Sequence, residues 1–500
     1  MPEALVIGGG FGGLAAALRL RAKGCHVKVV ERCAELGGRA QTFSRGGYRH
    51  DAGPTVITAP FLFDELFQLF GRQFSRAVTL KELNPWYRYY FRDGETFSYG
   101  GTLQDTLSEI DRISPQDVAG YEGLLAESQK IFDVGFSELA DQPFDRMGTM
   151  LRQIPRLLRL RCYRSVWRLV SEHIRDDRLR QAFAVQPLLV GGNPFDTTCI
   201  YNLIHFLERK WGIHFAMGGT GAIVTALTQL MGDTGIQIQT STTVKQIITR
   251  NGRAVGVEYA NGEREECDLV VANTDAAHLY RHLIPQQDQK LSARIKLRQA
   301  KYSMGLFVLY FGSRKQYPEV PHHSIWLGKR YRKLLKEIFA EKALPHDFSL
   351  YVHRPTATDP SFAPPNRDSY YVLAPVPNLN AAIDWDEEGP RMTERILGAL
   401  DATIMPGLLS NVEHDFYMTP HDFSANYLSE RGAGFSIAPL FYQSAWFRFH
   451  NRAEGLKNVY LVGAGTHPGG GVPGVLCSAK ATEHLIAADL GWETCHAQAS

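Results

Sequence analysis

Three glycines and one glutamate near the N-terminus have the types and the spacing that bind a dinucleotide. Gly8, Gly10 and Gly13 form a G-x-G-x-x-G pattern, and Glu31 follows about twenty residues later. The first glycine makes a tight turn, the second lets the backbone approach a pyrophosphate, and the third lets a helix pack closely on a strand. The carboxylate accepts hydrogen bonds from ribose hydroxyls. The chemistry predicted here is recognition of the ADP half of a dinucleotide.

The segments around these glycines have the composition of a β-α-β unit. Residues 4–7 are an apolar run typical of a buried parallel strand, residues 14–22 favour a helix, and residues 27–30 predict a second strand. Such a helix offers free N–H groups and the positive end of its dipole to phosphates. A glycine motif alone is weak evidence, and the alternative is a glycine-rich turn without a ligand. The two strands, with Glu31 at the end of the second, favour the dinucleotide site.

Two further glycine-rich segments indicate which dinucleotide binds. Gly37, Gly38 and Arg39 follow soon after the acid, where the glycines allow close approach to phosphates and the guanidinium can neutralise them. Taken alone, they could be an ordinary surface turn. Residues 462–475 connect a predicted strand to a helix whose N-terminus, expected near Gly474, can stabilise negative charge on a reduced flavin. Because NAD needs no second cradle and FAD is longer, the two segments together predict FAD.

A third segment completes the predicted FAD-binding domain. Residues 218–221 open a helix that runs to Met231, and the apolar runs that follow predict further strands, the last at 269–273. Val244 is expected to meet the adenine through its backbone. The FAD contacts predicted from all of these segments are Gly8, Gly10, Gly13, Glu31, Arg32, Gly38, Arg39, Thr55, Val244, Gly465, Thr466, Val472 and Pro473.

The composition of the whole chain limits the other possibilities. Its 500 residues exceed one hydrophobic core, and 44% hydrophobic with 21% charged residues indicates a folded protein of two or three domains. A net charge of +2 gives no reason to expect nucleic acid as a partner. Seven scattered cysteines form no CxxC pair, so we predict a reducing compartment, no disulfide framework and no metal site. We also expect no signal peptide, and no transmembrane helix because no run of about eighteen apolar residues occurs.

Motifs from end to end of the chain carry a family resemblance. They are GGGFGGLAAALRL (8–20), GGRA (37–40), DAGPTVIT (51–58), VGGNPF (190–195), GGTGA (218–222), LFVLYFG (306–312), YYVLAPVP (370–377), QSAWFR (443–448) and VGAGTHPGGGVPGV (462–475). With these motifs the chain resembles the bacterial and fungal type of carotenoid (phytoene) desaturase, within the flavin amine oxidase superfamily. The last motif is more specific than the dinucleotide fingerprint, which many flavoproteins share.

This resemblance implies an FAD-dependent reaction on a hydrophobic polyene. Hydrogens would be removed stepwise from phytoene, a forty-carbon chain, to give neurosporene or lycopene. Hydride would pass to the flavin, a proton would leave the adjacent carbon, and oxygen or a quinone would be the electron acceptor. At roughly 0.8 kcal/mol per buried CH₂, exposing such a chain to water would cost on the order of 30 kcal/mol. The substrate is therefore expected to be drawn directly from the bilayer.

The stretch 146–171 offers a surface for that membrane. It contains seven arginines and no acid, interleaved with leucine, isoleucine, valine and tryptophan. Basic amphipathic stretches favour anionic lipid surfaces. The alternative is a solvated basic face packed on its own protein. Pro155 predicts a break or a helix start within the stretch. We expect a peripheral or monotopic protein on the cytoplasmic face of a membrane.

The predicted fold class is α/β, with an α+β substrate part. It combines a discontinuous Rossmann-like FAD-binding domain, a mixed-sheet substrate domain and a helical membrane-facing subdomain. The expected boundaries are 1–75, 215–295 and 450–500 for the FAD-binding domain, 76–102 and 296–449 for the substrate domain, and 103–214 for the helical subdomain.

No catalytic base is assigned, and the oligomeric state is not predicted. The weak catalytic candidates are His467, Asp51, Asp145 and Arg146. Related flavoproteins are the nearest alternatives: a dehydrosqualene desaturase, a carotenoid isomerase or ketolase, or a protoporphyrinogen oxidase. A prenyl-binding protein of the GDP-dissociation-inhibitor fold, which uses no FAD, is the alternative from another class. The intact glycines and Glu31 argue against it.

Overall fold

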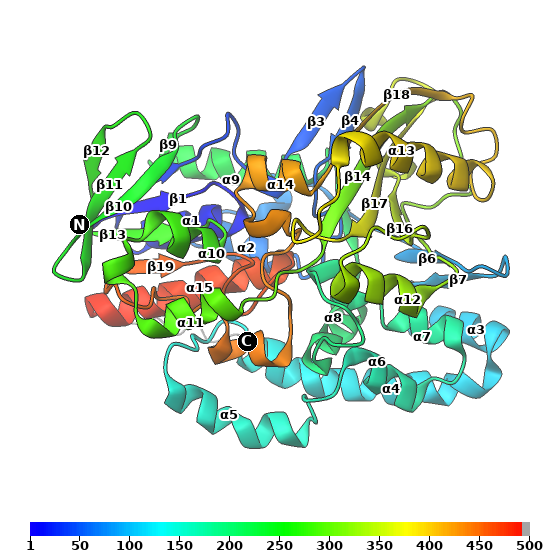
Figure 1. The fold of residues 1–500 in the computed structure, drawn as a ribbon, viewed down its shortest axis with the longest axis horizontal. Helices are drawn as coiled ribbons and strands as arrows, with labels where there is room; N and C mark the ends of the chain where they lie inside the picture. The colour runs from blue at the N-terminus through cyan, green and yellow to red at the C-terminus, as the bar shows by residue number, and fades with distance from the viewer. Residues whose placement is uncertain (493–500) are drawn as a thin grey trace.

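The computed structural model describes residues 1–492, so residues 493–500, which include Cys495 and the end of the predicted FAD-binding domain, lie outside the described residues. A five-stranded sheet at the left of Figure 1 has the order β19-β13-β1-β2-β9, and all of its strands are parallel. Its strands are β1 (Glu3–Ile7), β2 (His26–Val30), β9 (Gln237–Gln239), β13 (Leu269–Ala272) and β19 (Val459–Leu461). Three distant parts of the chain therefore meet in one sheet.

Helices α1 (Phe11–Ala22) and α15 (Val472–Leu490) pack against each other beside this sheet, and α9 (Thr220–Asp233) packs on α1. Their leucine and alanine side chains are buried in one apolar core with the strands. Both helices begin three residues earlier than predicted, directly after the glycines that precede them. The free N–H groups of each first turn therefore lie at the glycine loops themselves.

The second large sheet is seven-stranded and mixed, with the order β18-β14-β17-β16-β15-β6-β7. Its one parallel contact joins β6 and β15. The strands are β6 (Tyr87–Tyr90), β7 (Thr96–Tyr99), β14 (Gly305–Ser313), β15 (His323–Trp326), β16 (Leu350–His353), β17 (Asp368–Val376) and β18 (Val412–Met418). Helix α13 (Trp385–Asp401) covers one face of this sheet (Figure 1). The two sheets and their helices confirm the predicted α/β class with a mixed-sheet part.

Three small sheets complete the β structure. Their strands are β10 (Val244–Arg250), β11 (Arg253–Tyr259) and β12 (Arg264–Glu266), then β3 (Thr42–Arg45) with β4 (Tyr48–Asp51), then β5 (Leu80–Glu82) with β8 (His214–Ala216). The β3–β4 ribbon lies against the seven-stranded sheet, where the Tyr48 hydroxyl donates to Glu413 and the Phe43 ring lies 5.7 Å from that of Tyr310. The chain therefore crosses from the five-stranded sheet to the seven-stranded sheet soon after Gly37 and Gly38.

Helices fill the chain between the two halves of the seven-stranded sheet. They are α3 (Leu103–Ile113), α4 (Val118–Phe132), α5 (Met147–Arg159), α6 (Val166–His173), α7 (Asp177–Phe183) and α8 (Leu203–Trp211). The remaining helices are α2 (Phe61–Gln68), α10 (Ala276–His278), α11 (Leu291–Gln299), α12 (Tyr331–Lys336) and α14 (Pro420–Tyr427). Among residues 1–492, no helix has both the length and the apolar composition needed to span a bilayer.

Two expectations about the basic stretch are wrong. Helix α5 continues through Pro155. The proline has no N–H to donate to the carbonyl of Leu151, but Leu151 is exposed, so water can donate to this carbonyl. Arg164 is fully buried and bonded to Glu127 and Glu172, so it belongs to the core and cannot face a membrane. These acids lie outside the stretch in sequence and fold back onto it. The other arginines stay at the surface: those of α5 are exposed, and the exposed Arg161 and Arg168 both pair with Glu172.

Close packing at Gly13 generates a test of this arrangement. A Cβ at Gly13 would lie 2.0 Å from the Gly8 carbonyl oxygen, so Gly13→Ala must push α1 away from β1. We expect the variant to lose about 2 kcal/mol of stability, as overpacked sites do, and to hold less flavin than the wild type. Melting temperature and the flavin-to-protein absorbance ratio measure both effects.

The matched control is Gly398→Ala on α13, where a Cβ meets no atom within 4 Å. Alanine in an open helical position should leave flavin content unchanged and stability equal or higher. Equal flavin content and melting temperature in the Gly13→Ala protein would contradict the assigned packing.

Candidate cofactor and substrate site

A cavity of about 380 Å³ lies between the loops of the five-stranded sheet and the seven-stranded sheet. The glycine loop after β1, the end of β2 and the start of β10 form one part of its wall, and the loop before α15 forms another. The seven-stranded sheet contributes Leu306, Tyr371 and Leu373. The three segments predicted to bind FAD thus line one continuous space.

The carboxylate of Glu31 is held at the wall of this cavity by the backbone. Gly9 N–H donates to Glu31 Oε2 at 2.7 Å, and Cys33 N–H donates to Oε1 at 2.8 Å. Each carboxylate oxygen keeps a lone pair for a ribose hydroxyl. Gly10 precedes the first turn of α1, and a Cβ there would lie 2.9 Å from Asn273 Nδ2. The geometry suits the ADP half of a dinucleotide, with phosphates at the helix N-terminus.

Most of the predicted contacts meet at this cavity. The ten that line it are Gly8, Gly10, Glu31, Arg32, Gly38, Arg39, Thr55, Val244, Gly465 and Val472. Gly13 lies further along α1, where it allows the helix to approach Gly8. The Thr466 hydroxyl is buried and donates to the Phe449 carbonyl at 2.7 Å, so it holds the loop. Pro473 lines a second cavity on the other side of the α15 N-terminus.

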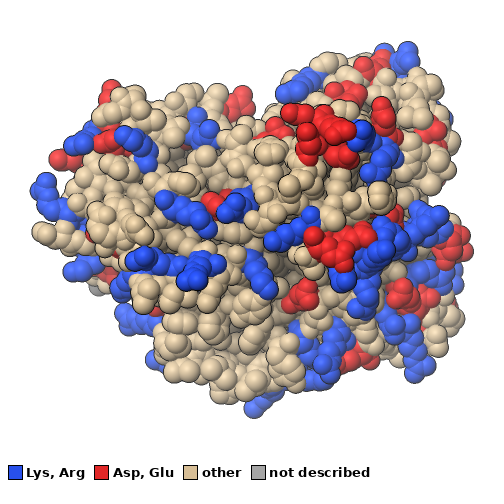
Figure 2. All heavy atoms as spheres, in the orientation of Figure 1, with Lys and Arg blue, Asp and Glu red and all other residues tan. Residues whose placement is uncertain are grey.

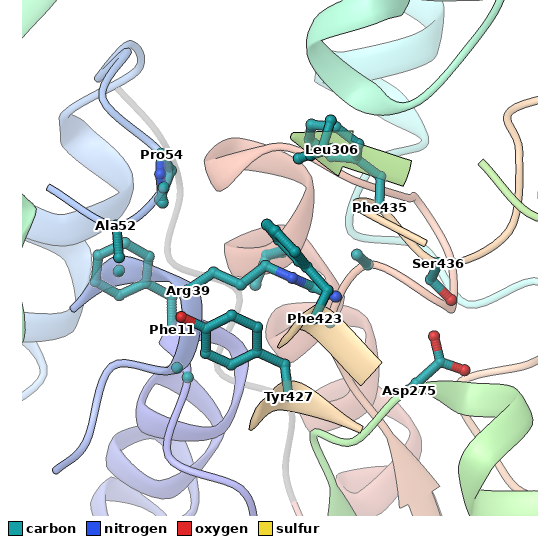
Figure 3. Close-up of a pocket in the computed structure, with 18 of the residues that line it drawn as sticks. Phe11, Arg39, Ala52, Pro54, Asp275, Leu306, Phe423, Tyr427, Phe435 and Ser436 are labelled. Carbon is teal, nitrogen blue, oxygen red and sulfur yellow. The ribbon is translucent and has the colours of Figure 1, made fainter. Parts of the chain in front are cut away.

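Charged groups on the wall differ in their availability to a ligand. Arg39 donates to Ser429 Oγ at 2.5 Å and lies beside Tyr427, and burial lowers the pKa of its guanidinium (Figure 3). Asp275 lies across the cavity from it, with a pKa raised by burial and with Oδ2 lacking a hydrogen-bond partner. Arg32 instead donates to the Asn426 carbonyl at 2.8 Å. Arg39 is therefore the better cation for a pyrophosphate.

Arg448 fixes the loop before α15 and was not predicted. Its guanidinium is buried and donates to the carbonyls of Thr466 at 3.0 Å and Ala464 at 2.6 Å. Burial lowers its pKa, but four carbonyl acceptors hold the charge in place. This arginine lies in the motif QSAWFR. The only sign of its role in the sequence is a single cation beside apolar residues.

A second cavity of about 220 Å³ is lined mainly by apolar side chains. It shares Val56, Leu189, Gly471 and Val472 with the first cavity, so the two meet at the N-terminus of α15. Its far wall contains Met150 and Leu157 of α5, with Phe441 and Ala445 beside them. This space can hold an extended apolar molecule between α15 and α5.

Among the described residues, Glu208 is the one carboxyl group on the wall of this second cavity. It is not among the site residues predicted from the sequence. It lies on α8, its Oε1 accepts from the Tyr87 hydroxyl at 3.2 Å, and Oε2 has no partner. Burial raises its pKa to about 8, so the carboxyl is neutral at pH 7. No motif surrounds it in the sequence, because its isolation arises only from tertiary packing.

The four weak catalytic candidates have structural contacts. His467 Nε2 donates to the Leu139 carbonyl at 2.9 Å and its ring packs on Phe144, and burial lowers its pKa to about 4. Asp51 is fully buried and accepts from Thr220 N–H at 3.0 Å. Asp145 pairs with Arg452, and Arg146 precedes α5. Of the four, only His467 lines either cavity.

The buried Glu208 carboxyl predicts a pH-dependent stability. Its pKa is raised in the folded protein, so between the ordinary carboxyl pKa and about pH 8 the unfolded chain has lost a proton that the folded protein retains. Stability contributed by this group is present at low pH and falls by about 1.4 kcal/mol per pH unit through that window. Between pH 5 and about pH 8, the melting temperature of Glu208→Gln should therefore fall less steeply with pH than that of the wild type.

The control is Glu263→Gln, which changes an exposed carboxyl and should keep the wild-type slope. A Glu208→Gln protein whose melting temperature follows pH as the wild type does would mean that Glu208 is ionised in the fold.

Comparison with known proteins agrees with this site. The family model described as flavin containing amine oxidoreductase matches residues 11–482. A lycopene-forming phytoene desaturase of Pseudescherichia vulneris is 45% identical over 98% of this chain and 100% of its own. A neurosporene-forming phytoene desaturase of Rhodobacter capsulatus is 39% identical over 97% of this chain and 94% of its own.

Among solved structures, an oxidoreductase from Methanosarcina mazei has the same fold, with a TM-score of 0.66 and 18% identity over 96% of this chain and 100% of that chain. The family match confirms the flavin predicted from the glycine segments, and the glycine cradle, the held Glu31 carboxylate and the unpartnered Asp275 oxygen fit such a cofactor. The chain belongs to the flavin containing amine oxidoreductase family, among relatives that are phytoene desaturases.

Proposed function

We propose that this protein is an FAD-dependent phytoene desaturase that forms neurosporene or lycopene. The observation that carries the proposal is the apolar cavity that meets the cofactor cavity at the N-terminus of α15. Relatives named phytoene desaturase support it, and the flavin-family match favours it over a prenyl-binding protein without FAD. Bound FAD would accept the two electrons that leave a CH–CH bond.

The residues of the chain have separate tasks in this proposal. Glu31 and Gly10 bind the ADP half, and Arg39 neutralises the phosphates. Leu139 and Phe144 exclude water from the apolar cavity and confine a polyene to it. The Glu208 carboxyl group keeps its proton, so this cavity carries no carboxylate charge that would disfavour the binding of an apolar chain. Oxygen or a quinone is proposed as the electron acceptor.

Product analysis after incubation with phytoene liposomes tests the function. The wild-type holoprotein should give neurosporene or lycopene by chromatography. Leu157→Trp places a larger side chain at the cavity wall on α5 and should lower kcat/KM by about tenfold or more, with flavin content unchanged, because more than 1.4 kcal/mol of productive binding is lost.

Leu409→Trp is the matched control, since Leu409 is 58% exposed, lies outside α5 and does not line the cavity. It should convert phytoene as the wild type does. Unconverted phytoene with flavin-loaded wild-type protein would refute the proposed activity, whereas equal activity of both variants would refute only the assignment of the cavity.

We further propose that α5 docks the protein on a membrane as a peripheral protein. Its residues Met147, Leu151, Ile154 and Leu158 are exposed, between 37% and 58%, and Phe441 nearby is also exposed. Figure 2 shows that much of the surface over α5 is neither acidic nor basic. The same helix supplies Met150 and Leu157 to the apolar cavity. A polyene could therefore pass from lipid to the cavity without crossing water.

Liposome flotation measures this docking. Replacing Leu151 and Leu158 together by serine should weaken membrane partition by about 3 kcal/mol, roughly a hundredfold, because two apolar side chains leave the lipid. The control is Leu409→Ser, since Leu409 is also 58% exposed but lies outside α5. If the double variant floats as well as the control, docking does not use α5.

A further inference from the structure

Three buried histidines meet where β15 and β16 pair. His323 begins β15 and lies opposite His353 at the end of β16, and His322 directly precedes β15. One ring nitrogen from each residue lies within 4.8 Å of the others. His323 and His353 are completely buried and His322 is 4% exposed. The cluster lines neither of the two cavities described above.

Hydrogen bonds to neighbouring hydroxyls leave one nitrogen free on two of these rings. His322 Nδ1 lies 2.7 Å from Thr358 Oγ1, and His323 Nδ1 lies 2.7 Å from the Tyr351 hydroxyl. With Nδ1–H donating in each case, the lone pair resides on Nε2, which has no partner in either residue. An imidazole with a free Nε2 lone pair is the form in which histidine binds a metal ion.

The third histidine faces a buried carboxylate. Both ring nitrogens of His353 lack a hydrogen bond, and its Nε2 lies 3.5 Å from Asp51 Oδ2. Asp51 Oδ1 accepts from Thr220 and Thr42, whereas Oδ2 has no hydrogen-bond partner. A carboxylate that orients one nitrogen of a histidine while the other ligates is a recurring arrangement around bound metals.

Without a ligand, these buried polar atoms that lack a hydrogen-bond partner lower the stability of the fold. Each buried polar atom without a partner costs about 1–3 kcal/mol. The atoms of these four residues that have no hydrogen-bond partner are His322 Nε2, His323 Nε2, His353 Nδ1, His353 Nε2 and Asp51 Oδ2. A cation would satisfy the imidazole lone pairs together, and the Asp51 carboxylate would offset part of its charge.

We propose that His322, His323 and His353 bind a zinc ion, with Asp51 orienting His353 from outside the ligand set. Three neutral imidazoles form a ligand set that zinc uses in proteins, and a water molecule can complete the coordination. Zinc–nitrogen bonds of about 2.0 Å place ligand nitrogens roughly 3.4 Å from one another, so the three rings would draw together when zinc binds.

The metal has a structural role in this proposal, because it contacts neither cofactor nor substrate cavity. It would join β15 to β16 and, through Asp51, to β4 and the first turn of α9. The Tyr351 hydroxyl that orients His323 also bonds Thr55 Oγ1 at 2.6 Å, and both residues line the cofactor cavity. Zinc would thus fix part of the wall behind the cofactor.

Metal content of the full-length protein tests the proposal. Protein from zinc-supplemented cells, dialysed without chelator, should contain about one zinc ion per chain by mass spectrometry of the metal. Cobalt(II) added to chelator-treated protein should give the visible absorption of a four-coordinate cobalt site. Chelation should lower the melting temperature and zinc should restore it, because the metal binds only the folded chain.

Variants decide whether these histidines are the ligands. His353→Gln and His322→Gln should lose the zinc, while His414→Gln should retain it, since His414 lies in a separate pair with His50. Less than about a tenth of an ion per wild-type chain, together with no cobalt spectrum, would overturn the proposal even if the variants fail to fold. Wild-type zinc content in folded His353→Gln would also overturn it.

Discussion

The common carboxyl edge of the five-stranded parallel sheet is the constraint on which the cofactor site depends. Because β1, β2, β13 and β19 are parallel neighbours, the loops that follow them emerge at the same edge. Gly8, Glu31 and Gly463 follow three of those strands and therefore meet, although they lie far apart in the chain. The absence of a side chain at Gly13 lets α1 approach this edge and direct its N-terminus at the same space. A shift of α1 would separate the phosphate-binding groups from the Glu31 carboxylate.

The N-terminus of α15 connects this cofactor edge to the apolar cavity. Two buried side chains hold the preceding loop from different sides, since Arg448 bonds its carbonyls and His467 bonds Leu139 in the helical part. The residues just after that loop belong to both cavities. In the proposed function, the flavin and an apolar substrate would meet beside this loop. That geometry accounts for a histidine in the loop without making it an acid or a base.

Asp51 lies at a junction between three parts of the molecule. Asp51, at the end of β4, bonds the first turn of α9 with one oxygen and faces His353 of the seven-stranded sheet with the other. The histidines in turn contact Tyr351, on the wall of the cofactor cavity. A buried charge costs stability unless it is compensated, so such junctions hold only when their partners are complete. Hydrogen bonds through Tyr351 therefore join the histidine cluster to the wall of the cofactor cavity.

Sequence alone determined the features that depend on local spacing. A flavin site and an α/β fold are predicted by the N-terminal glycines with Glu31, by the glycine-rich segment 462–475 and by the apolar strands. These signals come from the backbone needs of neighbouring residues, so they can be recognised in a short piece of sequence. The predicted helix starts are three residues late, because Gly12, Gly13 and Gly474 lie inside the first helical turns and not in the loops before them.

Only the tertiary structure decided which groups are isolated, paired or brought together. Arg164 is basic in a basic stretch, but acids from α4 and α6 bury it. Glu208 acquires its raised pKa from distant apolar neighbours that no spacing reveals. His353 lies some thirty positions from its two partners in the chain and meets them through strand pairing. Burial and long-range contact set the chemistry of these side chains, and neither is encoded within a short window of sequence.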